Sequence, residues 1–452
     1  MTHPTRHPDR RPFPRTSALA FLMGTIACVA PTPAAAPPSA AAEPVRHLLM
    51  ALVDRGLGER QVRVVGITPA AVLVLDDAGR TIEVSRAGLL AIVPPLPDAW
   101  PTGVRREIVW RELTALDEGP GGMLETADGQ RLPGHAADST FGDPASAADA
   151  PADPDTLLWR STLWGPIPVA LDDVRSLTIS SEATPTRPAT DPAGATTLDT
   201  LLLLNGDVLA GFVERVTPDV AFEVDGRAAT IPLDRVASIL FANAIRGPVG
   251  PRAWLADGTI AAIGDVALAG GALALTGPAP ASPWVDRPAA DLRAVAFDAA
   301  AFRPLADLVA SPAAPSPPQV SAGAPAAGRR WTPPVVAADG RAEPLGAADV
   351  ELPGPMTTQW AMPAGAVRFA AVAELPASCR IWGDLELVVV AVAADGALRP
   401  LARHRLHPAE PRVVLNAAID GAASLRMTVV PGPSGPIQDR VLLRRALVSI
   451  AP

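Results

Sequence analysis

Residues 201–241 read LLLLNGDVLAGFVERVTPDVAFEVDGRAATIPLDRVASILF, and their pattern of apolar runs and turns is the clearest indication of the fold. An apolar run ends at Asn205-Gly206, further apolar runs follow it, and Pro232 and Asp234 precede the last one. Asn-Gly indicates a tight hairpin turn, because type I′ turns need a positive φ that Asn and Gly tolerate. The stretch therefore predicts a small module of short β-strands.

The same pattern recurs on both sides of this stretch. One copy reads MLETADGQRLPG (123–134) and TLLWRSTLWGPIPVALDDVRSLTI (156–179), and another reads AWLADGTI (253–260), GALALTG (271–277) and ADLRAVAF (290–297). We interpret Asp128-Gly129 and Asp257-Gly258 as turn residues before anything else. Arrays of such repeats usually serve contact or display rather than catalysis.

The sequence divides at shifts in composition, and we predict a mainly β protein. Small β-barrel-like or β-sheet modules come first, and a jelly-roll β-sandwich ends the chain. The predicted parts begin with a signal peptide over 1–36, followed by a helix with the first β module over 44–100. A second module over 104–180 contains a disordered insertion at 135–156, and a linker at 181–198 leads to a third module over 199–245 and a fourth over 250–300. A Pro/Ala linker at 308–329 then precedes the sandwich, which covers 330–452 or begins near 302.

A helix is predicted over residues 45–57, ahead of the first strands. Apolar residues fall there at helical spacing, and two glycines would end it. The residues concerned are Leu48, Leu49, Leu52, Val53, Gly56 and Gly58.

Composition excludes several functions. The chain has 38 basic residues, all of them Arg, and it has no Tyr. Schiff-base lysines, P-loop lysines and tyrosine nucleophiles are therefore excluded. The net charge is −9, and without residues 1–36, which hold four Arg and one Asp, it is −12. An acidic chain without a basic cluster argues against a nucleic-acid partner.

The N-terminus has the pattern of a secretory signal peptide, with arginines, an apolar run at 18–23 and then small residues. Cleavage after Ala36 or Ala42 fits this pattern. Thr25-Ile26-Ala27-Cys28 resembles a lipoprotein processing box, so Cys28 is a candidate lipidation site, and the alternative is that it leaves with the leader. We expect a secreted, periplasmic or envelope protein without a transmembrane span after processing. Cys379 would then be the one remaining cysteine, most simply a small buried residue.

No catalytic constellation is recognisable. The sequence has no Gly-x-Ser-x-Gly elbow, no His-Glu-x-x-His and no Gly-rich phosphate loop. We predict no enzyme activity, no cofactor and no metal site. His404 and His407 are poorly spaced for one face of a strand. Trp159 and Trp164 could form an exposed sugar platform, but we favour a role in the core of a small module.

The C-terminal unit carries about seven longer strands. LVVV (387–390), ADGAL (394–398), VVLN (413–416), GAASLRMTV (421–429) and DRVLLRRA (439–446) follow in an order similar to the NPCBM family of carbohydrate-binding modules. The resemblance implies a galactose-binding-like sandwich and a glycan ligand. The family's Gly-Ile-Gly-x-His segment reads LPGPMTTQW (352–360) here, without a His.

Sugar sites usually combine an aromatic face with polar groups for the hydroxyls. The candidates in the C-terminal unit are Trp382, Asp384, Arg380, Trp360 and Gln359. We therefore expect a secreted, non-enzymatic protein that binds glycan or polysaccharide at the cell envelope. The alternative is a structural or protein-interaction protein of the envelope that uses the sandwich as a degenerate scaffold and binds other envelope proteins.

Overall fold

The computed structural model describes residues 47–96, 122–136, 155–179, 197–216, 219–279, 282–313, 331–336, 343–433 and 435–451. The predicted signal peptide, Cys28 and residues 181–196 of the predicted linker lie outside the described residues. No helix within the described ranges is long and apolar enough to cross a membrane.

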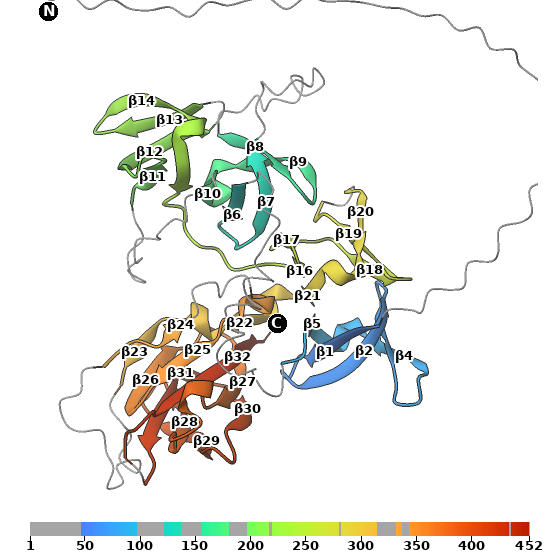
Figure 1. The fold of residues 1–452 in the computed structure, drawn as a ribbon, viewed down its shortest axis with the longest axis vertical. Helices are drawn as coiled ribbons and strands as arrows, with labels where there is room; N and C mark the ends of the chain where they lie inside the picture. The colour runs from blue at the N-terminus through green and yellow to red at the C-terminus, as the bar shows by residue number, and fades with distance from the viewer. Residues whose placement is uncertain are drawn as a thin grey trace, which may run out of the picture. The chain divides into compact units, whose positions relative to one another are not determined.

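The chain is mainly β, as the sequence predicts, and its first part holds four small β modules, three with five strands and one with six (Figure 1). Module A consists of β1 (Leu48–Asp54), β2 (Glu59–Ile67), β3 (Ala71–Leu75), β4 (Thr81–Ser85) and β5 (Leu89–Val93). Module B consists of β6 (Gly122–Thr126), β7 (Arg131–Ala136), β8 (Thr156–Ser161), β9 (Gly165–Ala170) and β10 (Val174–Thr178). Module C consists of β11 (Asp199–Leu203), β12 (Val208–Val216), β13 (Asp219–Val224), β14 (Arg227–Pro232) and β15 (Val236–Leu240). Module D consists of β16 (Arg252–Leu255), β17 (Ile260–Ala262), β18 (Val266–Ala269), β19 (Ala272–Thr276), β20 (Trp284–Pro288) and β21 (Leu292–Ala296), so its second strand is split in two.

All four modules share one topology. The first strand pairs with the second and with the closing strand, and the third strand joins the fourth. A single 3-10 turn precedes each closing strand: Arg86–Gly88, Leu171–Asp173, Leu233–Arg235 and Ala289–Asp291. The residue after each first strand donates its amide to the last carbonyl of that turn, as the Arg55–Gly88, Ala127–Asp173, Leu204–Arg235 and Ala256–Asp291 bonds show. The repeat is thus maintained by its backbone as well as by its apolar pattern.

The closing strands join the modules in pairs. In the pairing of β10 with β15, Leu177 lies opposite Ile239, and both occupy the fourth position of their strand. In the pairing of β21 with β5, Val295 lies opposite Ile92, again at equivalent positions. Modules B and C, and modules A and D, are therefore related by local twofold pairing, and all four of these side chains are buried.

The helix predicted over residues 45–57 is wrong, because Leu48–Asp54 is strand β1. Met50 and Leu52 face the core of the modules, whereas Ala51 and Val53 belong to a second apolar cluster on the opposite face. A strand buried on both faces carries apolar residues at consecutive positions, and such a run also satisfies helical spacing.

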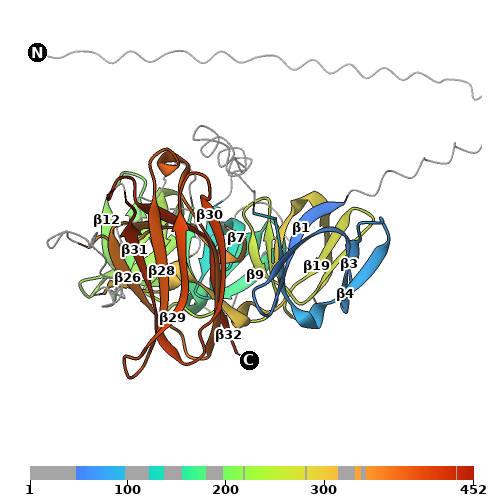
Figure 2. The ribbon, with the colours of Figure 1, turned by 90° about the horizontal axis from the view of Figure 1, so that it is seen from below.

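The C-terminal unit is a β-sandwich, as predicted, and Figure 2 shows β29, β28 and β31 side by side in one of its layers. One sheet has the order β24-β25-β32-β27-β30, with β22 also paired to β32, and the other has the order β23-β26-β31-β28-β29. The first sheet contains β22 (Phe302–Pro304), β24 (Val335–Val336), β25 (Val350–Pro353), β27 (Ala366–Glu374), β30 (Arg412–Ala418) and β32 (Arg440–Ile450). The second contains β23 (Ala310–Pro312), β26 (Met356–Ala361), β28 (Leu385–Ala393), β29 (Leu398–Leu406) and β31 (Ala422–Pro431).

Two predicted boundaries need correction. The Pro/Ala linker does not begin at residue 308, because Ala310–Pro312 pairs with β26 as an edge strand of the sandwich. The two ends of the insertion predicted at 135–156 are strands, because β7 runs to Ala136 and β8 begins at Thr156, and residues 137–154 lie outside the described residues. Short edge strands rich in Ala, Ser and Pro have the composition of linkers, so sequence alone does not separate them.

Candidate functional site

Three of the predicted ligand residues, Arg380, Trp382 and Asp384, lie on one loop. This loop, residues 375–384, joins β27 to β28. Trp382 has an exposed fraction of 66%, and its neighbour Ile381 reaches 72%. A large aromatic side chain that is mostly solvated contributes little to the core, so the loop presents Trp382 rather than packing it.

The geometry of the loop explains why Trp382 projects. Pro376 leads into a single 3-10 turn, Ala377–Cys379. The amide of Gly383 then donates to the carbonyl of Cys379 at 2.7 Å, which tightens the loop directly after Trp382. A Cβ at position 383 would come within 2.6 Å of that carbonyl, so glycine is required there.

Two ion pairs lie beside this loop, between β28 and β29. Arg405 donates from Nε and Nη2 to the two oxygens of Asp384, at 2.7 Å each. Arg403 donates in the same way to Glu386, at 2.6 and 2.7 Å. The hydrogen bonds and charge of Arg405 lower the pKa of Asp384, despite some opposing desolvation. These planar bidentate pairs hold their oxygen and nitrogen atoms in fixed positions.

The remaining loop residues have structural roles. Arg380 donates from Nε to the carbonyl of Leu375 at 3.2 Å, which braces the base of the loop. Cys379 is buried, and that burial raises the pKa of its thiol. A buried thiol with a raised pKa is a poor nucleophile.

Other segments support the loop from both sides. The amide of Leu375 donates to the carbonyl of Pro411, in the turn after β29. The amide of Gly432, in the loop after β31, donates to the carbonyl of Asp384. Trp382 therefore stands on an end of the sandwich where three connections are hydrogen-bonded together.

The structure does not bring Trp360 and Gln359 to this site. Trp360 is 1% exposed and belongs to the core of the sandwich, so it cannot stack on a ligand. Gln359 accepts hydrogen bonds from Arg426 on the neighbouring strand, and the register places this pair level with Val390. Val390 is six residues from Asp384 along the chain. At the rise per residue of a β-strand, this places the Gln359–Arg426 pair about 20 Å from Asp384.

The Trp159 alternative is settled in favour of the core. Trp159 is buried in module B and donates its indole N–H to the carbonyl of Leu132 at 3.1 Å. Trp164 is partly buried and packs against the same core.

Near the 375–384 loop, the Nε2 atom of His407 lies 3.6 Å from the Oε2 atom of Glu410. Within the described ranges, no group of three or more His, Cys, Asp or Glu side chains could hold a metal ion.

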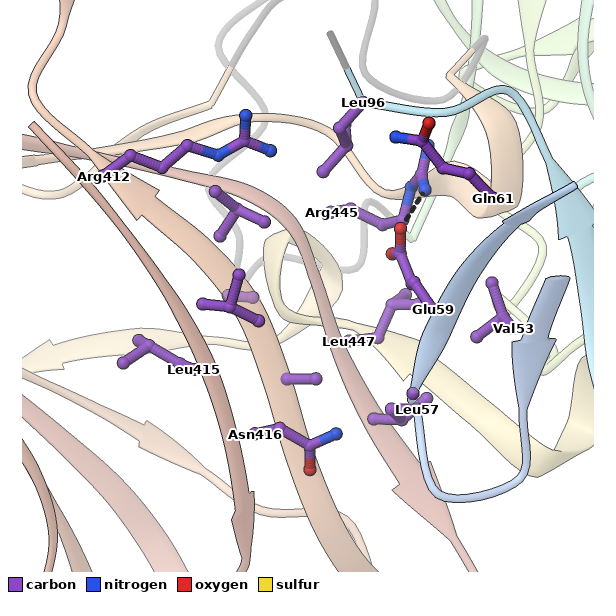
Figure 3. Close-up of a pocket in the computed structure, with 15 residues that line it drawn as sticks. Val53, Leu57, Glu59, Gln61, Leu96, Arg412, Leu415, Asn416, Arg445 and Leu447 are labelled. Carbon is purple, nitrogen blue, oxygen red and sulfur yellow. Dashed lines mark hydrogen bonds and ion pairs between the residues drawn. The ribbon is translucent and has the colours of Figure 1, made fainter. Parts of the chain in front are cut away.

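A cleft lies where module A meets the sandwich, and Figure 3 shows the residues that line it. It has a volume of about 200 Å³ and an apolar floor that includes Val372, Leu415 and Leu447. Arg445 crosses it and donates to Glu59 at 2.8 Å and to the carbonyl of Pro94 at 2.5 Å. No sequence pattern indicates the contact between Arg445 and Glu59, because the two residues are 386 positions apart.

Arg445 has a positive φ of 45° at an irregularity in β32. A side chain in that conformation is strained, and such strain persists only where surrounding contacts compensate for it. We interpret the cleft as part of the joint between module A and the sandwich, because its most polar feature is this internal ion pair.

No family model matches the chain, and no curated protein matches it. Among solved structures, the CBM51-2 and INT domains of Clostridium perfringens ZmpB are 14% identical over 23% of this chain and 22% of that chain, with a TM-score of 0.20. CBM51 from Clostridium perfringens GH95 in complex with methyl-galactose is 9% identical over 23% and 70%, with a TM-score of 0.21. The CBM22-1 xylan-binding domain from Paenibacillus barcinonensis Xyn10C is 13% identical over 26% and 80%, with a TM-score of 0.18.

This chain thus spans about a fifth of the first of these structures. These are distant similarities to β-sandwich carbohydrate-binding modules. At this degree of similarity they identify neither a ligand nor a reaction for this chain.

Proposed function

We propose that the chain is a non-enzymatic glycan-binding protein, and that Trp382 is the platform on which a sugar ring stacks. The observation that carries this proposal is the exposure of Trp382 two residues before the Asp384–Arg405 pair. Glu386 and Arg403 extend the polar surface by a second bidentate pair.

The chemistry of a sugar ring fits this arrangement. A pyranose has an apolar face of C–H groups, which packs on an indole, and a rim of hydroxyls, which need fixed donors and acceptors. Each carboxylate oxygen of Asp384 accepts one bond from Arg405 and keeps a second lone pair for a ligand hydroxyl. Because the pairs are already ordered, binding would cost little side-chain entropy there.

The protein would act outside the cytoplasm, at the cell envelope. The Arg-rich start, apolar run and small residues of the leader support this location. The order of apolar strands in the C-terminal unit supports membership of the NPCBM family, with a glycan as ligand. Cys28 remains the candidate for lipidation.

A glycan array with the full processed chain tests the proposal. We expect wild-type protein to bind a subset of glycans and Trp382→Ala to lose that binding. Trp284→Ala is the matched control, because Trp284 is also an exposed tryptophan but lies on β20 of module D. Binding that survives Trp382→Ala, or that disappears equally in the control, would contradict the assignment.

The alternative, a protein-interaction role, has one specific observation in its favour. Module C exposes a contiguous apolar face on β11 and β12, remote in sequence from Trp382. The two roles are compatible, because they use different parts of the chain.

A further inference from the structure

The first hairpin of each module has an outer face that can be compared across the four copies. One backbone hydrogen bond aligns them: Asp54 to Gly58, Thr126 to Gln130, Leu203 to Asp207, and Leu255 to Thr259. The register then places one outward pair at the same position in each module: Val53 and Glu59, Glu125 and Arg131, Leu202 and Val208, Trp254 and Ile260.

In module A this outer face is covered by the sandwich. Val53 is buried in an apolar cluster that also contains Leu447 of β32. Glu59 is ion-paired to Arg445 of the same strand at 2.8 Å. The outer face of this hairpin is therefore a docking surface in module A.

In module D the equivalent pair, Trp254 and Ile260, is buried in the same apolar cluster as Val53 and Leu447. Ile260 of β17 pairs edge to edge with Arg131 of β7, so modules B and D are neighbours in one sheet. Trp254 is buried, and Arg131 forms an ion pair with Glu125 at 3.3 Å. The outward pair is thus buried in module D, contacts the sandwich in module A and forms an ion pair in module B.

The fourth face, on module C, is apolar and open. It consists of Leu198, Leu202, Val208, Ala210 and Phe212, which we call the C face. Val208 is 63% exposed and Phe212 is 53% exposed. Register pairs Leu202 with Val208 and continues to bring Leu198 opposite Phe212, so these side chains form one stripe across β11 and β12. Soluble monomers rarely leave such a stripe uncovered.

We propose that the C face is a self-association surface, and that it docks on the C face of a second copy of this chain. Twofold contacts between like surfaces are the commonest way in which chains associate. This chain already uses local twofold pairing between its own modules, at Leu177 with Ile239 and at Ile92 with Val295.

Charge at the two ends of the stripe favours the same arrangement. Asp207 precedes Val208 at one end of β12, and Arg215 stands outward at the other end, opposite Ala221. A twofold axis that crosses β12 near Gly211, midway between Asp207 and Arg215, lays the two strands antiparallel. Each copy's Arg215 then reaches the hairpin end of the other copy, where Asp207 lies, and the uncharged middle of the stripe is buried.

Sedimentation equilibrium of the full processed chain over a range of concentrations tests the proposal. We expect a monomer–dimer equilibrium in which Val208→Ser with Phe212→Ser raises the dissociation constant at least tenfold. Arg215→Asp should weaken the dimer at low salt and have less effect at high salt, because an exposed charge pair is screened. Ile82→Ser, at an exposed apolar residue of β4 in module A, is the matched control and should leave the dimer unchanged.

The thermal unfolding of each variant checks that it still folds, and substitutions at exposed positions should leave it close to wild type. A wild-type chain that stays monomeric at all concentrations overturns the proposal. The proposal is also overturned if the Val208→Ser, Phe212→Ser variant still forms the dimer. Neither result bears on glycan binding at Trp382, which is tested separately.

Discussion

At the scale of single residues, a buried arginine fixes the contact between modules B and D. Arg252 donates to the carbonyl of Asp128 at 2.8 Å and to its carboxylate at 2.9 Å. The side chain of Arg252 is 4% exposed, whereas the exposed Arg246–Asp173 pair joins module B to the segment after module C on the surface. The Asp128-Gly129 turn is therefore also an intermodule contact.

Removing Arg252 should destabilise the protein strongly. Arg252→Met leaves the Asp128 carboxylate without its one cationic partner among the described residues, in a partly buried site, which costs about 3 kcal/mol. Arg246→Ala is the matched control and should cost less than about 1 kcal/mol, because exposed pairs contribute little. Urea unfolding of both variants measures the difference, and equal effects would show that burial of the Arg252 pair does not matter.

The same pair predicts a pH dependence. Desolvation would raise the pKa of Asp128, but the Thr126 hydroxyl and the charge of Arg252 together lower it below its usual range. A carboxyl whose pKa is depressed on folding stabilises the protein above its unfolded pKa, and that stabilisation is lost as pH falls through the folded value. We expect the free energy of unfolding to fall less steeply in Asp128→Asn than in wild type below about pH 4. Equal slopes would contradict this account.

The residues of the candidate site were predictable only in part. The sequence identified Trp382, Arg380 and Asp384 because they lie within five positions of one another in a loop. It could not separate Trp382 from Trp360, since exposure depends on how two sheets pack and not on local composition. The pairing of Arg405 with Asp384 was missed, because it joins neighbouring strands 21 residues apart.

At the scale of elements, a close approach between strands requires glycine at one position of the second strand in two modules. A Cβ on Gly211 would lie 2.0 Å from the carbonyl of Glu223, and one on Gly134, at the equivalent position of module B, would lie 2.2 Å from that of Arg160. The third strand can cross so closely only because both positions are glycine.

Gly211→Ala should therefore destabilise module C by at least about 2 kcal/mol, because backbone must move to admit the methyl group. Gly88→Ala in module A is the matched control: nothing lies within 4 Å of its Cβ position, and the change should be close to neutral. Thermal unfolding of the two variants measures this contrast. A Gly211→Ala protein as stable as the control would mean that the strands do not approach so closely.

The turns of the modules could be predicted and one first strand could not. Gly129, Gly206 and Gly258 all have positive φ, as their Asp-Gly and Asn-Gly dipeptides predict. The strand Leu48–Asp54 looked helical because contacts on both of its faces come from distant segments. Turn chemistry is local, whereas burial on two faces is set by tertiary structure.

At the scale of the whole molecule, the sandwich is joined to the modules and is not an independent appendage. Leu447 and Phe302 share an apolar cluster with residues of modules A and D. Arg445 adds the ion pair to Glu59. None of these contacts was predictable, because each joins segments far apart in the sequence. Binding experiments therefore need the full chain, since an isolated sandwich would expose this surface.

Two substitutions at Arg445 separate its contact from its backbone strain. Arg445→Ala and Arg445→Gly both remove the pair with Glu59, but Gly tolerates the φ of 45° without the cost of a Cβ. We expect both variants to be less stable than wild type and Arg445→Gly to be more stable than Arg445→Ala by about 1 kcal/mol. Calorimetric unfolding measures the order, and the reverse order would contradict the strained conformation.

We propose that Trp382 binds a glycan at an end of the sandwich. The most direct test of this proposal is affinity electrophoresis of the full processed chain through gels that contain a panel of polysaccharides. We expect at least one polysaccharide to retard the wild-type protein, and we expect this retardation to be retained in Trp382→Phe and in Trp284→Ala and lost in Trp382→Ala. Retardation that persists in Trp382→Ala, or no retardation by any polysaccharide in the panel, would contradict it.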